Sequence, residues 1–450
     1  MNYDQFIDEF FKFEKEQNLI DLEYEGVKVW VLARNRIFSN IAHKLELLQT
    51  GEYTVTDSKV KRVWYMLKYL SRAFINIFIP VKKADIIVFN HPRKVLKNGA
   101  YLDIYTQWYI DSMHKENKSV LVIDSPLNWN KHLIAKDSSI RNIENFGVLR
   151  KIIAKYARRK ELPIQFDEIS KQLIELFGSD GHLKKEIATQ FDSFIVDERY
   201  YTKLIKKSDA NKVVYVVKNS MHSLISASNT LNIPVWEIQH GVMGRHNIMY
   251  SYEGRDTVPY FPDGMYLMSK LWLDRTPMPL GLNDVLFYET DITKDDEEEI
   301  KNNKAVILLS QPTVATQLVS FLETNITNSN YEYIFKLHPT EFALWRQLYP
   351  NLSNLDHENS NLTVVDSFTP NLDTLLKSST YLVGVNSTSI LEGMYRNVKP
   401  FILNTSGASL MTDLFDKDEY IRVEIDEYVE FKSASEGIKQ VDKNTLFYKV

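Results

Sequence analysis

Polar residues that can do acid–base chemistry follow an apolar, strand-like run near the middle of the chain. In "PVWEIQHGVMGRHNIMYSYEG", residues 234–254, the run ends at His240 and Gly241, where the chain must turn. Glycine allows a tight turn or a close backbone approach, and a general base must reach a substrate hydroxyl. The candidate bases are His240, Glu253 and Asp103, in that order. The alternative for His240 is a structural histidine that fixes the loop.

Four other polar residues accompany these bases in the first half of the chain. His91 and Arg93 follow the apolar run "ADIIVFN", while Gln239 and His246 lie on either side of His240. Together with Gly241 they are candidates for contacts with the substrate that supplies the hydroxyl.

A candidate phosphate site lies in the second half, in "YLVGVNSTSILEGMYRNVKPFIL", residues 381–403. The pattern predicts a strand, a small polar turn and a helix, whose free N–H groups and dipole favour an anion. The turn residues are Asn386, Ser387, Thr388 and Ser389. Glu392 lies on the same helical face as Thr388 and can accept hydrogen bonds from a ribose or sugar diol. The alternative is simple N-capping, with Glu392 completing a capping box that starts at Ser389.

Two further strand ends of the second half carry polar side chains. "YIFKLHPTE" places Lys336 and His338 there, and "AVILLSQPT" places Ser310 and Gln311. The lysine is a cation for a phosphate, and the imidazole can donate to a diphosphate or protonate a leaving phosphate. A capping or packing histidine is the alternative for His338.

The elements that must position these residues alternate between short, β-branched strands and helical segments. This alternation predicts parallel, doubly wound sheets, which bind ligands beyond the carboxyl ends of their strands. We therefore expect an α/β fold with two Rossmann-like domains facing each other across a cleft. The expected parts are a helical region (1–83), a first Rossmann-like domain (84–289), a linker (290–304), a second Rossmann-like domain (305–425) and a tail that packs back on the first domain (426–450).

The composition and the missing motifs argue against several classes of function. The 450 residues exceed one ordinary core, and a net charge of −5 does not indicate a nucleic-acid partner. The chain has no cysteine, which excludes disulfides, thiolate nucleophiles and Cys-ligated zinc. Neither histidine pairs with metal-ligand spacing nor phosphate-loop or nucleophile-elbow motifs occur. We predict no metal and no cofactor.

A basic amphipathic segment precedes the first domain. Residues 59–83, "KVKRVWYMLKYLSRAFINIFIPVKK", contain seven basic residues and no acidic one. Such a helix is typical of contact with an anionic membrane surface, and a core helix with a solvated basic face is the alternative. The sequence indicates no signal peptide and no spanning helix. We therefore expect a cytoplasmic protein, peripheral at the inner face of the cytoplasmic membrane.

Three motifs in this order, "EIQHG", "KLHP" and "NSTSILEGMYRNVKP", resemble bacterial surface-polysaccharide glycosyltransferases of the GT-B fold. Among these are capsule Kdo transferases, "HP"-motif sialyltransferases and teichoic-acid glycerophosphotransferases. The resemblance covers the chain from about Ala84 to Leu403 and implies donor phosphates near His338 and the 387–389 turn. It also implies an acceptor glycan over the first domain and catalysis without an obligatory metal. The acidic Asp/Glu-Asp/Glu-Gly motif that supplies the base in those sialyltransferases is matched only partly, by "YEG" at 252–254.

The function predicted from these patterns is transfer of a sugar to a growing capsule or lipopolysaccharide O-antigen glycan, including a lipid-linked one. The donor is a nucleotide sugar, a CMP-sugar or a sugar diphosphate such as phosphoribosyl diphosphate. Three alternatives stay open: a polyol-phosphate transferase of the teichoic-acid type, an isomerase similar to nucleotide-sugar 2-epimerases, and a non-catalytic nucleotide- or glycan-binding subunit. The identity of the base also stays open.

Overall fold

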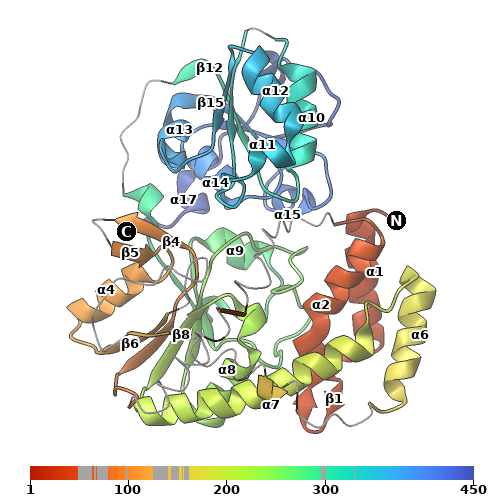
Figure 1. The fold of residues 1–450 in the computed structure, drawn as a ribbon, viewed down its shortest axis with the longest axis vertical. Coiled ribbons are helices and arrows are strands. Elements are labelled where there is room, and N and C mark those ends of the chain that lie inside the picture. Colours follow the sequence, from red (N-terminus) through yellow and green to blue (C-terminus); the bar gives the residue numbers. More distant parts are fainter. Residues whose placement is uncertain are drawn as a thin grey trace.

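The chain forms two α/β domains, stacked vertically in Figure 1, with helical elements beside the first. This computed structural model describes residues 1–48, 63–64, 67, 80–97, 100–124, 140–142, 150, 152–154, 156, 162–294, 301–328 and 330–449. The predicted basic helix at 59–83 therefore falls outside the described residues, except for 63–64, 67 and 80–83. In the part of the chain that is described, none of the helices has the length and apolar character needed to span a bilayer.

The first domain is built on a parallel sheet of seven strands in the order β11-β10-β9-β8-β3-β6-β7. The strands are β3 (Ile86–Phe89), β6 (Val120–Asp124), β7 (Ile140–Asn142), β8 (Lys212–Val216), β9 (Val235–Ile238), β10 (Gly264–Leu267) and β11 (Val285–Phe287). Strands β3 and β6 are buried throughout, as expected for parallel strands covered on both faces. The strand order reverses between β3 and β8, and the carboxyl ends beside such a reversal are where open α/β sheets bind ligands.

The second domain repeats this plan with six parallel strands in the order β14-β13-β12-β15-β16-β17. They are β12 (Asn302–Leu309), β13 (Glu332–Lys336), β14 (Leu362–Val365), β15 (Ser379–Gly384), β16 (Lys399–Leu403) and β17 (Ile421–Val423). The order reverses between β12 and β15. Both sheets therefore confirm the predicted fold class of two Rossmann-like domains.

Helices cover both sheets. In the first domain they are α1 (Tyr3–Glu16), α2 (Val29–Lys44), α4 (Gln107–Lys115), α6 (Gln165–Phe177), α7 (Leu183–Ser208), α8 (His222–Thr230) and α9 (Lys270–Arg275). In the second they are α10 (Ala315–Asn325), α11 (Trp345–Leu348), α12 (Pro350–Glu358), α13 (Leu372–Ser378), α14 (Thr388–Tyr395), α15 (Ser409–Thr412), α16 (Phe431–Ala434) and α17 (Lys443–Leu446). Figure 1 shows α1, α2 and α6 beside the first sheet rather than on the second domain.

The N-terminal helices are locked to each other by aromatic packing and one buried ion pair. Phe6 and Phe10 of α1 contact the ring of Phe38 on α2 at centroid distances of 4.8 and 5.2 Å. Glu14 and Arg34 form a bidentate pair with two N···O distances of 2.6 Å, and their side chains are 7% and 3% exposed. Because Arg34 also donates to the carbonyl of Ile248, this pair ties the helices to the loop that follows β9.

The chain passes between the domains twice. The first crossing lies between residue 294 and β12, which begins at Asn302. At the other end, the backbone N–H of Tyr448 donates to the carbonyl of Met268 at 2.7 Å, and its ring packs on Phe287. The last described residues therefore contact the first domain.

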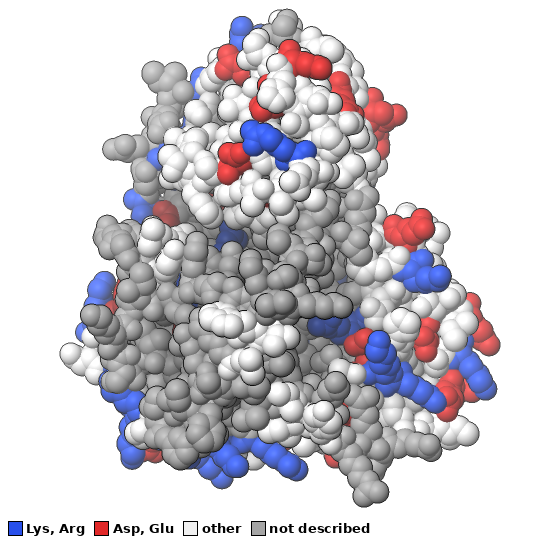
Figure 2. All heavy atoms as spheres, in the orientation of Figure 1, with Lys and Arg blue, Asp and Glu red and all other residues white. Residues whose placement is uncertain are grey.

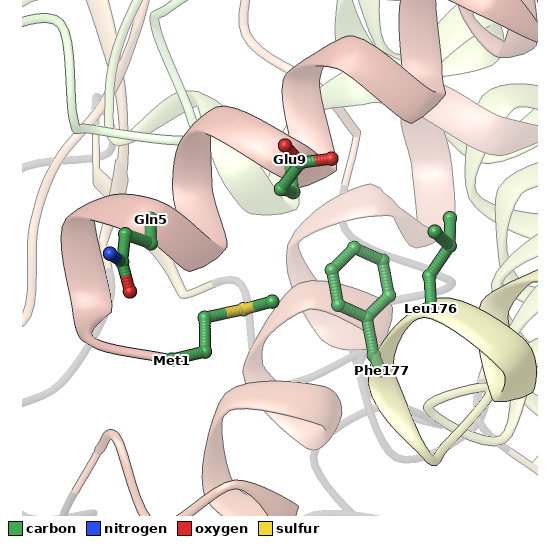
Figure 3. Close-up of a pocket in the computed structure, with 5 residues that line it drawn as sticks. All are labelled: Met1, Gln5, Glu9, Leu176 and Phe177. Atoms are coloured by element: carbon green, nitrogen blue, oxygen red, sulfur yellow. The ribbon is translucent and has the colours of Figure 1, made fainter.

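The described surface carries charges of both signs. Figure 2 shows Lys and Arg together with Asp and Glu side chains on both domains of the face in view. A separate hollow of about 400 Å³ lies between α1 and the end of α6 (Figure 3). It is lined by Met1, Gln5, Glu9, Leu176 and Phe177. None of the predicted site residues belongs to this hollow.

Candidate functional site at the domain junction

Two His-Pro turns, one in each domain, have the same internal hydrogen bond. His91 follows β3 and His338 follows β13, and each is followed by a proline that has no N–H. The N–H of Arg93 donates to Nδ1 of His91 at 3.1 Å, and the N–H of Thr340 donates to Nδ1 of His338 at 3.3 Å. Nδ1 of His338 also lies 2.7 Å from the hydroxyl oxygen of Thr340, which can donate to it as well. A neutral imidazole whose Nδ1 accepts a hydrogen bond carries its proton on Nε2. Each turn therefore holds an Nε2–H donor at the carboxyl end of its sheet.

A buried carboxylate holds each turn in place. Oδ2 of Asp103 accepts the N–H of His91 at 2.5 Å, and Oε2 of Glu341 accepts the N–H of His338 at 2.6 Å. Asp103 is only 1% exposed, and its Oδ1 accepts two more backbone N–H groups, from residues 105 and 106. Burial raises the pKa of Asp103 to about 6, although these hydrogen bonds oppose the shift. Asp103, a candidate base, therefore uses its carboxylate to hold the turn in place.

Glu341 is a site residue that the sequence patterns do not indicate. It is fully buried and accepts the hydroxyls of Ser310 at 3.1 Å and Tyr349 at 2.6 Å in addition to the N–H of His338. It thereby joins the end of β12 to the end of β13. The sequence signal for this role is the spacing in "HPTE", where the glutamate stands three residues after the histidine. At that spacing, a carboxylate can accept the backbone N–H of the first residue of a turn.

Three imidazoles near the junction are neutral at physiological pH. Burial, together with the positive charge of Arg93, lowers the pKa of His91, His240 and His338 to about 4 each. For His91, the charges of His240 and Lys94 act in the same direction. A neutral imidazole donates a hydrogen bond through its protonated nitrogen and can accept a hydrogen bond or a proton at the other nitrogen.

The first-domain imidazoles lie together. The rings of His91 and His240 stack with centroids 6.1 Å apart and an interplanar angle of 26°. Tyr105 packs edge-on against both, at 5.1 and 6.3 Å, and its hydroxyl accepts a hydrogen bond from Arg93 at 3.2 Å. The ends of β3 and β9 therefore present one cluster of imidazoles with a guanidinium at its edge.

Electrostatic interactions connect this cluster to the second domain. The charge of Arg93 lowers the pKa of both His338 and Glu392, and Glu392 in turn raises the pKa of Tyr105. Figure 1 shows the hairpin β4 (Lys94–Lys97) and β5 (Ala100–Asp103), which starts directly after Arg93, at the level where the domains meet. The predicted residues of the two domains thus meet at one junction.

The turn before α14 decides between the two interpretations of Glu392. Ser387 is the N-cap, and its Oγ accepts the N–H of Ser389 at 3.3 Å. Glu392 therefore lies five residues after the cap and cannot be the capping-box partner, which would stand at the third helical position. Asn386 contributes to the same turn by donating to the carbonyl of Gly407 at 3.4 Å. The Glu392 side chain is half-buried, and its carboxyl interacts electrostatically with Arg93 of the first domain.

Donor binding is expected to strengthen as pH rises from 6 to 8. Burial raises the pKa of Glu392 to about 7. Hydroxyl groups of a ligand bind the ionised carboxylate, so binding releases a proton, and the affinity increases up to the pKa and levels off above it. The change is about tenfold between these pH values. The histidines with a pKa of about 4 do not titrate there. Isothermal titration at several pH values measures the slope, and Glu392→Gln is expected to flatten it; an equal slope in the variant would contradict this assignment.

Several predicted residues lie elsewhere or are already bonded. Gln239 donates to the carbonyl of Gly241 at 3.0 Å and accepts the N–H of Met268 at 2.9 Å, so its amide links β9 to β10. Lys336 donates to the carbonyl of Ser367 at 2.6 Å. Their side chains support neighbouring loops in this structure. Gln311 follows β12 and is partly buried.

The remaining two candidates of the loop after β9 form ion pairs. Glu253 is exposed and bonds Arg245 at 2.5 Å, which places it on the surface rather than beside His240. His246 is 5% exposed, and its Nδ1 lies 2.7 Å from Oδ2 of Asp413 in the second domain. Burial lowers the pKa of His246, but the hydrogen bond and charge of Asp413 raise it by more. His246 therefore joins the two domains.

A buried polar network anchors this loop and was also missed. Glu237 of β9 is fully buried and accepts the hydroxyls of Tyr250 at 2.5 Å and Tyr215 at 3.1 Å. Lys218, 1% exposed, donates to the hydroxyl of Tyr252 at 2.9 Å. The signal in the sequence was a charged residue at the centre or end of each apolar run, in "VWEIQ" and "VVKN". These contacts hold the chain on both sides of His240.

The described residues contain no group of three or more His, Asp or Glu side chains arranged to hold a metal ion. The donors at the junction are instead imidazole N–H groups, a guanidinium, hydroxyls and the N-terminus of α14. The fold and these side chains define a two-domain, Rossmann-like α/β protein whose facing strand ends suit an anionic ligand that also carries hydroxyl groups.

Comparison with known proteins adds structural likeness only. No protein-family model and no curated protein matches the sequence. Among solved structures, UDP-GlcNAc 2-epimerase of Methanocaldococcus jannaschii with UDP-GlcNAc and UDP is 12% identical, with a TM-score of 0.45 over 81% of this chain and 95% of that one. MurG of Acinetobacter baumannii is 8% identical, with a TM-score of 0.43 over 80% and 92%. The spinosyn rhamnosyltransferase SpnG with spinosyn aglycone is 11% identical, with a TM-score of 0.41 over 80% and 89%. Likeness at this level carries no argument about activity.

Proposed function

We propose that the protein is a metal-independent glycosyltransferase that moves a sugar from a nucleotide- or diphosphate-activated donor to a growing capsule or lipopolysaccharide glycan. One observation carries the proposal. His338 and Glu392 of the second domain meet the His91–His240 cluster of the first domain at a single junction, linked by the charge of Arg93.

The second domain suits the donor. Ser387 caps an eight-residue helix whose free N–H groups and dipole favour a phosphate. The Nε2–H of His338 supplies a further donor, and the carboxylate of Glu392 can accept from ribose or sugar hydroxyls. The N–H groups at the start of α14 and the Nε2–H of His338 stabilise the negative charge that develops on the departing phosphate, which is the main electrostatic contribution such a site makes.

The first domain suits the acceptor. His240 is neutral, and among the residues that the structure describes its Nδ1 has no hydrogen-bond partner. In the proposed step, His240 takes the proton of an acceptor hydroxyl, the hydroxyl oxygen bonds to the anomeric carbon, and the bond from that carbon to the phosphate oxygen breaks. The phosphate leaves with the electron pair. A bound phosphate raises the pKa of a neighbouring imidazole and so makes His240 a better base.

A ligand screen followed by product analysis tests this proposal. Thermal shift against nucleotides, nucleotide sugars and phosphoribosyl diphosphate should identify a donor, because a ligand that binds only the folded state raises Tm. With that donor and a glycan acceptor, mass spectrometry should show the acceptor gaining one sugar residue. A gain of a polyol phosphate, conversion of the donor without an acceptor, or saturable binding without turnover would each contradict the proposal.

A further inference from the structure

We propose that the His91-Pro92-Arg93 turn and His240 bind a second anionic group, a phosphate or carboxylate carried by one of the two substrates. This extends the proposed function, which places the donor phosphates on the second domain and leaves the chemistry recognised by the first domain unspecified. The inferred substrate pair therefore presents an anion on each side of the junction.

The first step of the argument is the likeness between the two His-Pro turns. Both are held by a buried carboxylate on the histidine N–H and by an N–H from two residues later on Nδ1. Both therefore carry the ring proton on Nε2. The first-domain turn differs by having Arg93 where the second has Thr340, so it adds a full positive charge to the same donor.

The second step is that the charge of Arg93 is not neutralised locally. Its side chain is exposed and donates to the hydroxyl of Tyr105, and no carboxylate in the described ranges forms an ion pair with it. The neighbouring Lys94 differs, because it pairs with Asp124 at 3.0 Å and both side chains are fully buried. Glu392 interacts with Arg93 from the opposite domain, yet with a pKa of about 7 it is only partly ionised near neutral pH.

The third step is position. The turn follows β3, beside the point where the strand order reverses between β3 and β8, which is the position where open α/β sheets bind ligands. His240 follows β9 and stacks on His91 at 6.1 Å. Nδ1 of His240 is buried and has no hydrogen-bond partner in the described part of the chain, so the protein does not fix the tautomer, and Nε2 can either donate to an anion or accept from a hydroxyl.

Inorganic phosphate and pyrophosphate are the probes for this site. Isothermal titration of the full-length protein should show Arg93→Gln weakening phosphate binding by at least about tenfold, the scale of one charge-assisted hydrogen bond. Arg36→Gln, an exposed arginine of α2, is the matched control and should bind phosphate normally. Long-range proton–nitrogen spectra of the histidine rings should show the His91 and His240 resonances shifting with phosphate in the wild type but not in Arg93→Gln.

A double-mutant cycle assigns the anion to one substrate. If it belongs to the donor, pyrophosphate spans both turns, and the effects of Arg93→Gln and His338→Ala are coupled rather than additive. If it belongs to the acceptor, the two effects add. The inference is overturned if neither probe shifts the His91 or His240 resonances, or if only His338→Ala reduces binding. Failure of the proposed transferase activity would leave the ring shifts intact, so the two failures are distinguishable.

Discussion

Replacing His338 with alanine is expected to lower kcat/KM for the donor by about 10²–10³-fold, the usual effect of removing one preorganised donor from a developing oxyanion. The imidazole is neutral, and its Nδ1 is occupied by the N–H of Thr340, so its Nε2–H is the group that meets the leaving phosphate. The fold should survive, because Glu341 bonds the backbone N–H of residue 338 and not its ring. Steady-state kinetics and thermal unfolding of the same preparation measure both effects.

His357→Ala is the matched control for this prediction. That histidine is exposed on α12 of the same domain, and its loss should change neither kcat/KM nor Tm measurably. His338→Gln, which retains an N–H donor, should recover part of the rate. If His338→Ala turned over donor as fast as the His357→Ala protein, the leaving-group role of His338 would be excluded.

Replacing Glu14 with alanine is expected to lower the free energy of unfolding by about 3–5 kcal/mol, because it leaves the guanidinium of Arg34 buried without its partner. Glu14 bonds Arg34 through both carboxylate oxygens and also accepts the indole N–H of Trp30. Urea denaturation followed by tryptophan fluorescence measures the change.

Two further variants make the Glu14 result interpretable. Glu16→Ala, on the exposed side of the same helix, should change the free energy of unfolding by no more than about 0.5 kcal/mol. Glu14→Leu combined with Arg34→Met removes both charges and should regain much of the lost stability. Equal urea midpoints for Glu14→Ala and Glu16→Ala would show that the ion pair does not stabilise the fold.

The sequence was sufficient to predict the fold class and the positions of the strand ends, because short β-branched runs bounded by turn residues mark parallel strands. His91, His240, His338 and the turn at Ser387 were predictable for the same reason, since each follows such a run. Their meeting at one junction then followed from the rule that ligands bind at carboxyl ends.

The direction of each side chain in a turn could not be predicted, because it depends on which backbone N–H groups the folded chain leaves unpaired. Asp103 had the chemistry of a base, but three backbone N–H groups hold its carboxylate. Gln239 likewise uses its amide to join two strands. Glu341 and Glu237 were not predicted as site residues. Both are fully buried, and their hydrogen bonds depend on partners that only the folded chain brings together.

The return of the chain end to Met268 has a mechanical consequence. Two crossings of the chain, together with the ion pair between His246 and Asp413, limit the positions that the two His-Pro turns can take relative to each other more than a single connection would.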